Sequence, residues 1–161
     1  MSLERFLLAV ENDDILGAML SLDSIESFDT PLEELQAQTL LNSIISRGMF
    51  AVAKEMIRRG ANVNTVENDG YTSIHYACLK GYNDLIHLLI EAGANLNSQT
   101  DIGWTPLHLA TNSGHLESMR ILVDAGADVS LRHHFGLSPI DMANMKDNQD
   151  MIRLLTTQRA T

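Results

Sequence analysis

The feature that most constrains this chain is a sequence period of 33 residues. Gly70, Gly103 and Gly136 follow one another at this step. Other residue classes keep the same step, as in the sets Gly48, Gly81, Gly114; Thr72, Thr105, Ser138; Ile74, Leu107, Ile140; and Ala77, Ala110, Ala143. A constant period of this length marks a repeat array, in which each unit buries its apolar face only against its neighbours. The period therefore predicts a stack of similar units.

The copy that begins at Gly103 contains the signals for a turn followed by a short helix. Gly103 provides the positive φ angle that a tight turn needs. Thr105 offers the hydroxyl of an N-cap, and Pro106 stands at the first helical position, where its missing N–H costs nothing. His108, three residues after the cap, is placed to bond back across the turn. Gly114 then ends the helix as a left-handed cap.

The two helices of each copy differ in the size of their side chains. The second helix of this copy is predicted to run through Met119 and Leu122 and to stop at Gly126. The first, inner helices have small residues that let neighbouring helices approach closely, namely Ala77, Cys78, Ala110, Thr111 and Ala143. The outer helices have larger residues, among them Leu85, Leu88 and Leu89. Leu89 and Leu122 are therefore expected to be buried.

The stretch GWTPLHLATNSGHLESMRILVDAGADV resembles an ankyrin repeat close to consensus. GYTSIHYACLKGYNDLIHLLIEAGANLN is a second copy, with Ser73 in place of the usual proline. FGLSPIDMANMKDNQDMIRLL is a third, with Asp141 for the histidine and Asp147 for the glycine. Residues 39–64 are similar but have a degraded start, and residues 3–21 look like one more helix pair. There Ala9 would stand where Ala110 stands, and Asp13 where Gly114 stands.

The resemblance implies an all-α ankyrin-repeat solenoid, in which stacked antiparallel helix pairs are joined by β-hairpin-like loops. We expect a single domain over 1–161. Its expected parts are N-terminal capping helices and a connector at 1–35, repeats at 36–66, 67–99 and 100–132, and a C-terminal capping repeat at 133–161. The departures from consensus in the last copy fit a cap whose outer side faces water.

As a family, ankyrin repeats are protein-binding scaffolds without chemistry of their own. They bind partners mainly through the hairpin tips and the exposed side of the inner helices, on the concave face. The matching positions give the predicted partner-binding residues Tyr71, Leu79, Lys80, Ile102, Trp104, Asn112, Arg132, Phe135 and Met145. Only 5% of the residues are aromatic, yet Tyr71, Trp104 and Phe135 fall in this set, one in each of three consecutive repeats. We expect Tyr71 and Trp104 to be binding anchors; the alternative, that such an aromatic only covers its hairpin, stays open.

The charge of the chain is unevenly distributed. The net charge is −10, and residues 1–34 hold nine acids and one arginine, so that this segment carries −8. A chain this acidic repels phosphate backbones, and general nucleic-acid binding is not expected. The acidic end is interpreted either as a solubilising surface or as a docking surface for a basic partner. The predicted partner-binding face has the opposite sign of charge, because it holds more bases than acids. The bases are Arg47, Lys80, Arg132 and Lys146, and the acids are Asp69 and Asp101.

The chain offers no constellation of residues for catalysis, a cofactor or a metal ion, and we do not expect an enzyme. His75 and His108 occupy the repeat's own histidine position and are interpreted as capping groups. His133 and His134 are adjacent, so both rings do not share one helix face. Cys78 lies at a small-residue position and is interpreted as a buried, inert thiol.

A non-catalytic adaptor that binds a partner protein is the function these features favour. The alternative is a small acidic inhibitor, of the immunity or antitoxin kind, that blocks an enzyme. No apolar run reaches the roughly 18 residues of a membrane span, and one cysteine forms no internal disulfide. We therefore expect a cytoplasmic monomer that binds neither membrane nor nucleic acid.

Overall fold

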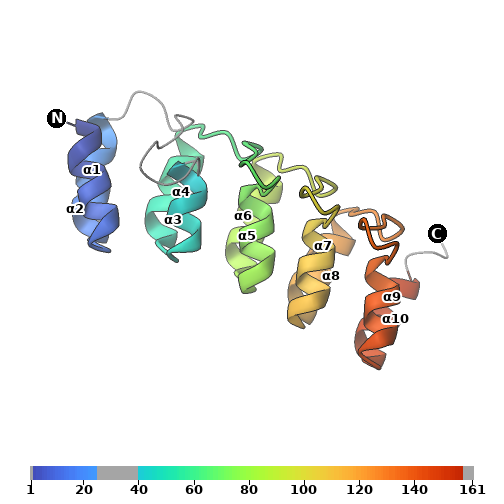
Figure 1. Cartoon of the computed structure of the whole chain (residues 1–161). Coiled ribbons are helices and arrows are strands. Elements are labelled where there is room, and N and C mark those ends of the chain that lie inside the picture. Colours follow the sequence, from blue (N-terminus) through green and yellow to red (C-terminus); the bar gives the residue numbers. More distant parts are fainter. Residues whose placement is uncertain (1, 25–39, 158–161) are drawn as a thin grey trace.

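The computed structural model describes residues 2–24 and 40–157, which form five helix pairs standing side by side in a row (Figure 1). This part of the chain contains ten α-helices, one 3-10 helix and no β-strand. The elements are α1 Ser2–Glu11, α2 Ile15–Ser21, the 3-10 helix Leu22–Ser24, α3 Leu40–Ser46, α4 Phe50–Arg58, α5 Ser73–Lys80, α6 Asn83–Glu91, α7 Pro106–Ser113, α8 Leu116–Asp124, α9 Pro139–Met145 and α10 Gln149–Thr157. The predicted all-α stack of helix pairs is confirmed. Of the predicted connector, residues 25–35 lie outside the described residues, as do 36–39 and 158–161.

Reciprocal hydrogen bonds begin the inner helices of the last three repeats. Thr105 accepts a bond from the backbone N–H of His108, and the His108 ring accepts one from the Thr105 N–H. The same capping box joins Thr72 to His75 and Ser138 to Asp141. The capping role predicted for the two histidines is confirmed.

Left-handed residues end the inner helices, as the sequence predicts. Gly81 and Gly114 have φ angles of 73° and 80°. At the corresponding positions of the first and last pairs, Asp13 and Asp147 adopt the same conformation with φ angles of 53° and 50°. Aspartate tolerates this region better than most residues.

The apolar core is continuous along the stack. Leu89 and Leu122 of the outer helices are completely buried, as predicted. Ala77, Ala110 and Ala143 of the inner helices are buried too. Within the described residues, no helix combines the length and apolar character that a membrane crossing requires.

The loops between the repeats form hairpins that touch their neighbours. The Thr100 N–H donates to the carbonyl of Trp104 at 2.9 Å, which closes one hairpin. The Asp101 N–H donates to the carbonyl of Asp69 in the preceding hairpin at 3.0 Å, and the His134 N–H donates to that of Ile102 at 3.0 Å. These bonds hold successive hairpin tips in line along one edge of the stack (Figure 1).

Candidate functional site

The hairpin tips present exposed apolar side chains. Ile102 and Phe135 occupy equivalent tip positions in successive repeats, and their side chains are 47% and 77% exposed. Val66, on the strand-like arm of an earlier hairpin, is 60% exposed. The His134–Ile102 backbone bond makes the tips of Ile102 and Phe135 direct neighbours. Exposed apolar residues that are neighbours in this way are typical of recognition surfaces.

The Trp104 side chain packs against its own hairpin and is less exposed than we expect of a binding anchor. It is half-buried, and its ring lies nearly parallel to that of His133, with centroids 5.8 Å apart. The indole N–H is buried and has no hydrogen-bond partner among the described residues. The rings of Phe135 and His133 pack edge to face, with their centroids 5.6 Å apart. Trp104 therefore covers its hairpin with much of its surface, while Phe135 projects from it.

Tyr71 is half-buried in a similar way. Its ring packs against His75 at 5.5 Å and Tyr76 at 5.2 Å. The Tyr76 hydroxyl donates to the carboxylate of the buried Glu67 at 2.7 Å. Burial, and then the negative charge of Asp69, raises the pKa of Tyr71. Tyr71 therefore stays neutral at physiological pH and offers an apolar ring edge with a hydroxyl.

The two capping histidines link neighbouring repeats and carry no charge. The His75 Nδ1 accepts from the Thr72 N–H, so its Nε2–H donates to the carbonyls of Ser98 and Trp104, both at 3.1 Å. The Nε2–H of His108 donates to the Leu137 carbonyl at 3.1 Å. Burial lowers the pKa of His75 and of His108 to about 4, so both rings are neutral near pH 7. They hold the hairpins in place and are not available as catalytic bases.

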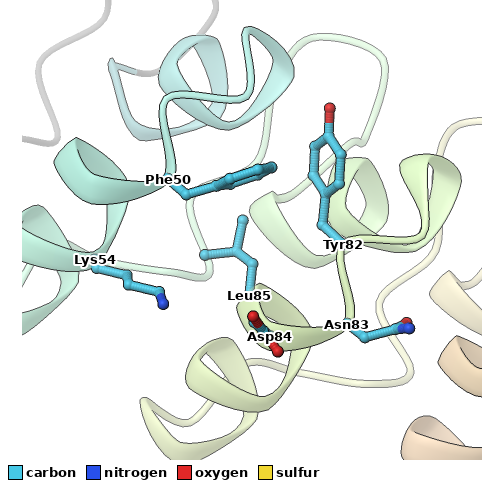
Figure 2. A pocket seen from close by; sticks show the side chains of 6 residues that line it. All are labelled: Phe50, Lys54, Tyr82, Asn83, Asp84 and Leu85. Carbon is cyan, nitrogen blue, oxygen red and sulfur yellow. The ribbon is translucent and has the colours of Figure 1, made fainter. Parts of the chain in front are cut away.

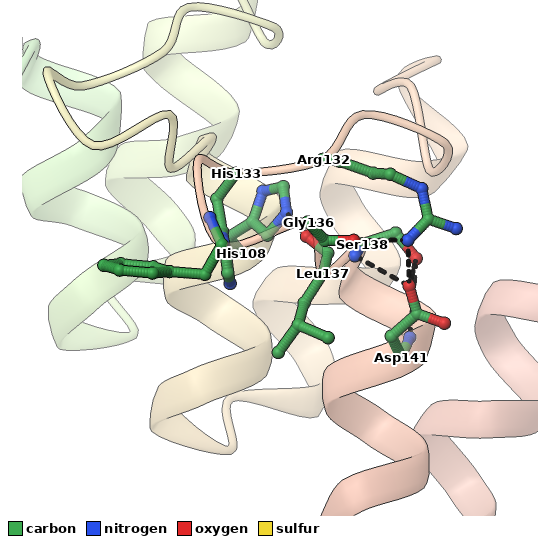
Figure 3. Close-up of polar contacts among 8 residues, drawn as sticks. His108, Arg132, His133, Gly136, Leu137, Ser138 and Asp141 are labelled. Carbon is green, nitrogen blue, oxygen red and sulfur yellow. Dashed lines mark hydrogen bonds and ion pairs between the residues drawn. The ribbon is translucent and has the colours of Figure 1, made fainter.

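Arg132 is engaged within the protein. Figure 3 shows its guanidinium reaching Asp141, with an Nη1–Oδ2 distance of 2.7 Å, and it also donates to the carbonyl of Gly136. Hydrogen bonds from the N–H and hydroxyl of Ser138, together with Arg132, lower the pKa of Asp141. Arg47 likewise lies 3.6 Å from Asp13. Two of the four bases expected on this face are thus ion-paired, and its positive surplus is smaller than the sequence suggests.

The remaining predicted positions line the ends of the inner helices. Lys80 and Asn112 are exposed, and Met145 is 74% exposed. Leu79 is half-buried, and its carbonyl accepts a bond from the His115 ring at 3.2 Å. The structure therefore places Ile102, Phe135 and Met145 as the exposed apolar members of the predicted set, with Lys80 and Asn112 as exposed polar members.

A separate open groove of about 310 Å³ lies between the starts of the outer helices α4 and α6. Figure 2 shows Phe50 and Tyr82 above it, with ring centroids 4.5 Å apart, and Leu85 at its floor. Lys54 and Asp84 stand at its sides. Among the described residues that line it there is no histidine, cysteine or serine.

The thiol of Cys78 and the histidines do not form a reactive or metal-binding centre. Cys78 is completely buried, and burial raises the pKa of its thiol, which keeps it protonated. Among the described residues there is no group of three or more histidine, cysteine, aspartate or glutamate side chains placed to hold a metal ion.

Comparison with known proteins agrees with this geometry. A family model described as ankyrin repeats in many copies matches residues 56–110. A second model, for the single ankyrin repeat, matches residues 102–134. No curated protein matches the chain.

Proposed function

The chain is an ankyrin-repeat protein, and on this premise we propose that it binds a partner protein through its hairpin tips and the exposed side of its inner helices. Ankyrin repeats are generally protein–protein interaction modules and are typically non-catalytic. In this proposal the chain acts as a monomeric adaptor whose ligand is neither nucleic acid nor membrane.

The observation that carries the proposal is the exposed apolar pair Ile102 and Phe135 on adjacent tips. Both side chains stand on hairpins that are fixed by backbone and histidine bonds, so little conformational freedom is lost when a partner binds. Trp104 supports Phe135 through His133. The partner surface that fits these tips is apolar at its centre. Acidic groups at its edge would pair with the exposed Lys80 and Lys146.

The proposal is tested by photo-crosslinking in the native cell. A benzophenone amino acid is placed at Ile102, at Phe135 or, as a control, at the exposed His87 of α6. We expect the same protein to be captured from positions 102 and 135 and not from 87. With that protein purified, the Ile102→Ala/Phe135→Ala variant is expected to bind about tenfold more weakly or worse, as loss of central anchors does. Capture from position 87 alone, or unchanged affinity of the double variant, contradicts this placement.

The acidic inhibitor is the second candidate, and the uneven charge of the chain favours it. An inhibitor of a basic, nucleic-acid-directed enzyme would use the −8 segment at 1–34 as its contact. Its affinity would fall steeply with salt, whereas binding to the apolar tips would change little. A salt titration of the purified complex separates the two functions.

A further inference from the structure

The groove between the outer helices α4 and α6 continues along both helices. Its first part, of about 310 Å³, and a second hollow of about 230 Å³ share Lys54 and Asp84 and so form one channel, which we call the α4–α6 groove. Figure 2 shows the first part, with Lys54 on α4 and Asp84 on α6. The apolar side chains that line the groove are Phe50, Tyr82, Leu85 and Leu88. The Phe50 side chain is 38% exposed, so part of this apolar lining faces solvent.

The two walls of the α4–α6 groove have charges of opposite sign. Lys54 and Arg58 on α4 stand against one acid of that helix, Glu55, which gives +1. Asp84 and Glu91 on α6 stand against no lysine or arginine of that helix, which gives −2. In the part of the chain that the structure describes, Lys54, Asp84 and Glu91 take part in no ion pair and no side-chain hydrogen bond.

The next two outer helices neutralise the equivalent charges internally. The acid and the base of this register pair within α8 and within α10, as Glu117 with Arg120 at 3.4 Å and Asp150 with Arg153 at 3.9 Å. Helix α4 lacks the acid, because Ala51 stands three residues before Lys54. Helix α6 lacks the base, because a histidine, His87, stands three residues after Asp84. Each wall of the α4–α6 groove therefore keeps a charge that its own helix does not pair.

The spacing of the charges fits a third helix laid along the groove. Lys54 and Arg58 are four residues apart, and Asp84 and Glu91 are seven apart, which corresponds to rises of about 6 Å and about 10.5 Å. One flank of a partner helix repeats at the same steps of four and seven residues. The side chains of such a helix pack as ridges into the groove between two others. The helix that fits has an apolar stripe between one acidic and one basic flank.

A second copy of this chain does not supply such a helix. Its α4 has an excess of positive charge and would be repelled by Lys54, and its α6 has an excess of negative charge and would be repelled by Asp84. In α8 and α10 the acid and the base lie three residues apart on one side of the helix and already pair with each other. The charges therefore favour a helix from another protein.

We propose that the α4–α6 groove is a second docking surface, which shares no residue with the hairpin tips and binds a partner helix whose two flanks have opposite charges. The apolar stripe of this helix contacts Phe50 and Leu85. Its acidic flank lies along α4 beside Lys54, and its basic flank lies along α6 beside Asp84.

The test uses the full chain and three fluorescent helical peptides of about 15 residues, or roughly four turns, that share a leucine stripe. The mixed peptide has glutamate on one flank and lysine on the other, whereas the two uniform peptides have lysine or glutamate on both. Fluorescence anisotropy measures their affinities for the unaltered chain, for Asp84→Lys and for the matched control Glu117→Lys, which changes the equivalent position of α8 outside the groove. Circular dichroism first shows that all three proteins are folded.

We expect the unaltered chain to bind the mixed peptide at least about tenfold more tightly than either uniform peptide. Asp84→Lys makes both walls basic, so this variant should bind the glutamate peptide most tightly. Glu117→Lys should keep the preference of the unaltered chain. Phe50→Gln, which removes an apolar contact and leaves the charge unchanged, should weaken binding of the mixed peptide about tenfold.

Several outcomes would overturn the proposal. The chain has a net charge of −10, so tightest binding of the lysine peptide by the unaltered chain would mean attraction by charge alone. An order of affinities that Asp84→Lys leaves unchanged, or that Glu117→Lys changes equally, would place the peptide elsewhere, and binding of none of the peptides would exclude the docking surface. Dimers that sedimentation detects in the unaltered chain and not in Asp84→Lys would assign the groove to a second copy. Ile102→Ala/Phe135→Ala should bind the mixed peptide normally, so this proposal and the tip proposal fail independently.

Discussion

The interior of the stack and its N-terminal end are built from the same helix pair but are held in different ways. Between interior repeats, His75 and His108 donate buried hydrogen bonds to the next hairpin, and backbone bonds join the tips. The first pair packs through α2 against α4, and two arginines link it to the second pair. Arg47 pairs with Asp13 at 3.6 Å and donates to the Val10 carbonyl at 3.4 Å, and Arg59 pairs with Asp23 at 2.6 Å. Buried bonds between rigid groups resist opening more than exposed ion pairs do. The stability of this fold therefore depends on the junctions between helix pairs.

The largest expected effect comes from charge placed in the interior. Leu122→Asp puts an unpaired carboxylate at a completely buried position and should cost about 4 kcal/mol or more of the free energy of unfolding. The matched change at the end, Leu20→Asp, alters an exposed residue and should cost less than about 0.5 kcal/mol. Urea unfolding followed by circular dichroism measures both. Equal destabilisation would mean that the assigned orientation of the outer helices is wrong.

Two hairpin glycines, Gly70 and Gly136, differ in how closely the next hairpin approaches them. Gly70 has a φ of 82°, and an added Cβ would lie 2.6 Å from the Thr100 backbone of the next hairpin. Gly136 has nearly the same φ, 80°, but nothing lies within 4 Å of its added Cβ. Gly136→Ala should therefore cost about 1 kcal/mol through backbone strain alone, and Gly70→Ala about 3 kcal/mol. Thermal melts of the two variants check the difference, and similar melting temperatures would contradict the close approach of the hairpins.

Acid should weaken the interior junctions. The folded pKa of His75 and of His108, about 4, lies below the ordinary value of about 6.5, so the unfolded chain binds protons that the folded chain does not. Their contribution is complete above pH 6.5 or so and is lost as the pH falls from there towards 4. Between about pH 7.5 and about pH 5 we expect a loss of about 1 to 2 kcal/mol for each histidine. His108→Gln should reduce this pH dependence, and the exposed control His87→Gln should not; urea unfolding at each pH measures it.

The smallest effect is expected at the N-terminal junction. Arg47→Gln removes the ion pair with Asp13 and the hydrogen bond to the Val10 carbonyl, and should cost less than about 1 kcal/mol, with the ion-pair part of the difference lost at about 1 M salt. Hydrogen exchange should speed up in α1 and α2 and stay unchanged in α7 and α8. Arg153→Gln, at the exposed ion pair with Asp150 in α10, is the control for removal of an arginine. Faster exchange throughout the stack would show that the first pair is as strongly coupled as the interior.

Much of the fold could be predicted from the sequence because its signals are local. Gly114 ends α7, and Asp13 and Asp147 replace such a glycine at the ends of α1 and α9, as the period indicated. The capping histidines and the buried Leu89 and Leu122 followed from the same register. Each of these depends on residues within one repeat, whose positions the 33-residue step specifies.

The candidate surface was less predictable because exposure depends on neighbouring repeats. Trp104 and Phe135 belong to the same predicted set, yet the first stacks on His133 and the second projects into solvent. The exposure of Leu8, Leu16 and Leu20 in the first helix pair was not anticipated, although the sequence holds one sign of it. Leu16 is apolar where the later repeats have Asp84, Glu117 and Asp150. The partner-binding residues themselves stay a prediction.

The sequence by itself determined the repeat, the place of each helix and turn, and the sidedness of each helix, because these come from capping, glycine conformation and apolar spacing within about 33 residues. Only the tertiary structure decided which charges are paired and which apolar residues remain uncovered. Arg132 forms an ion pair with Asp141 across a hairpin. Leu20 is exposed because no described helix pair lies beyond it. Burial and ion pairing depend on the distances between repeats, which no single repeat encodes.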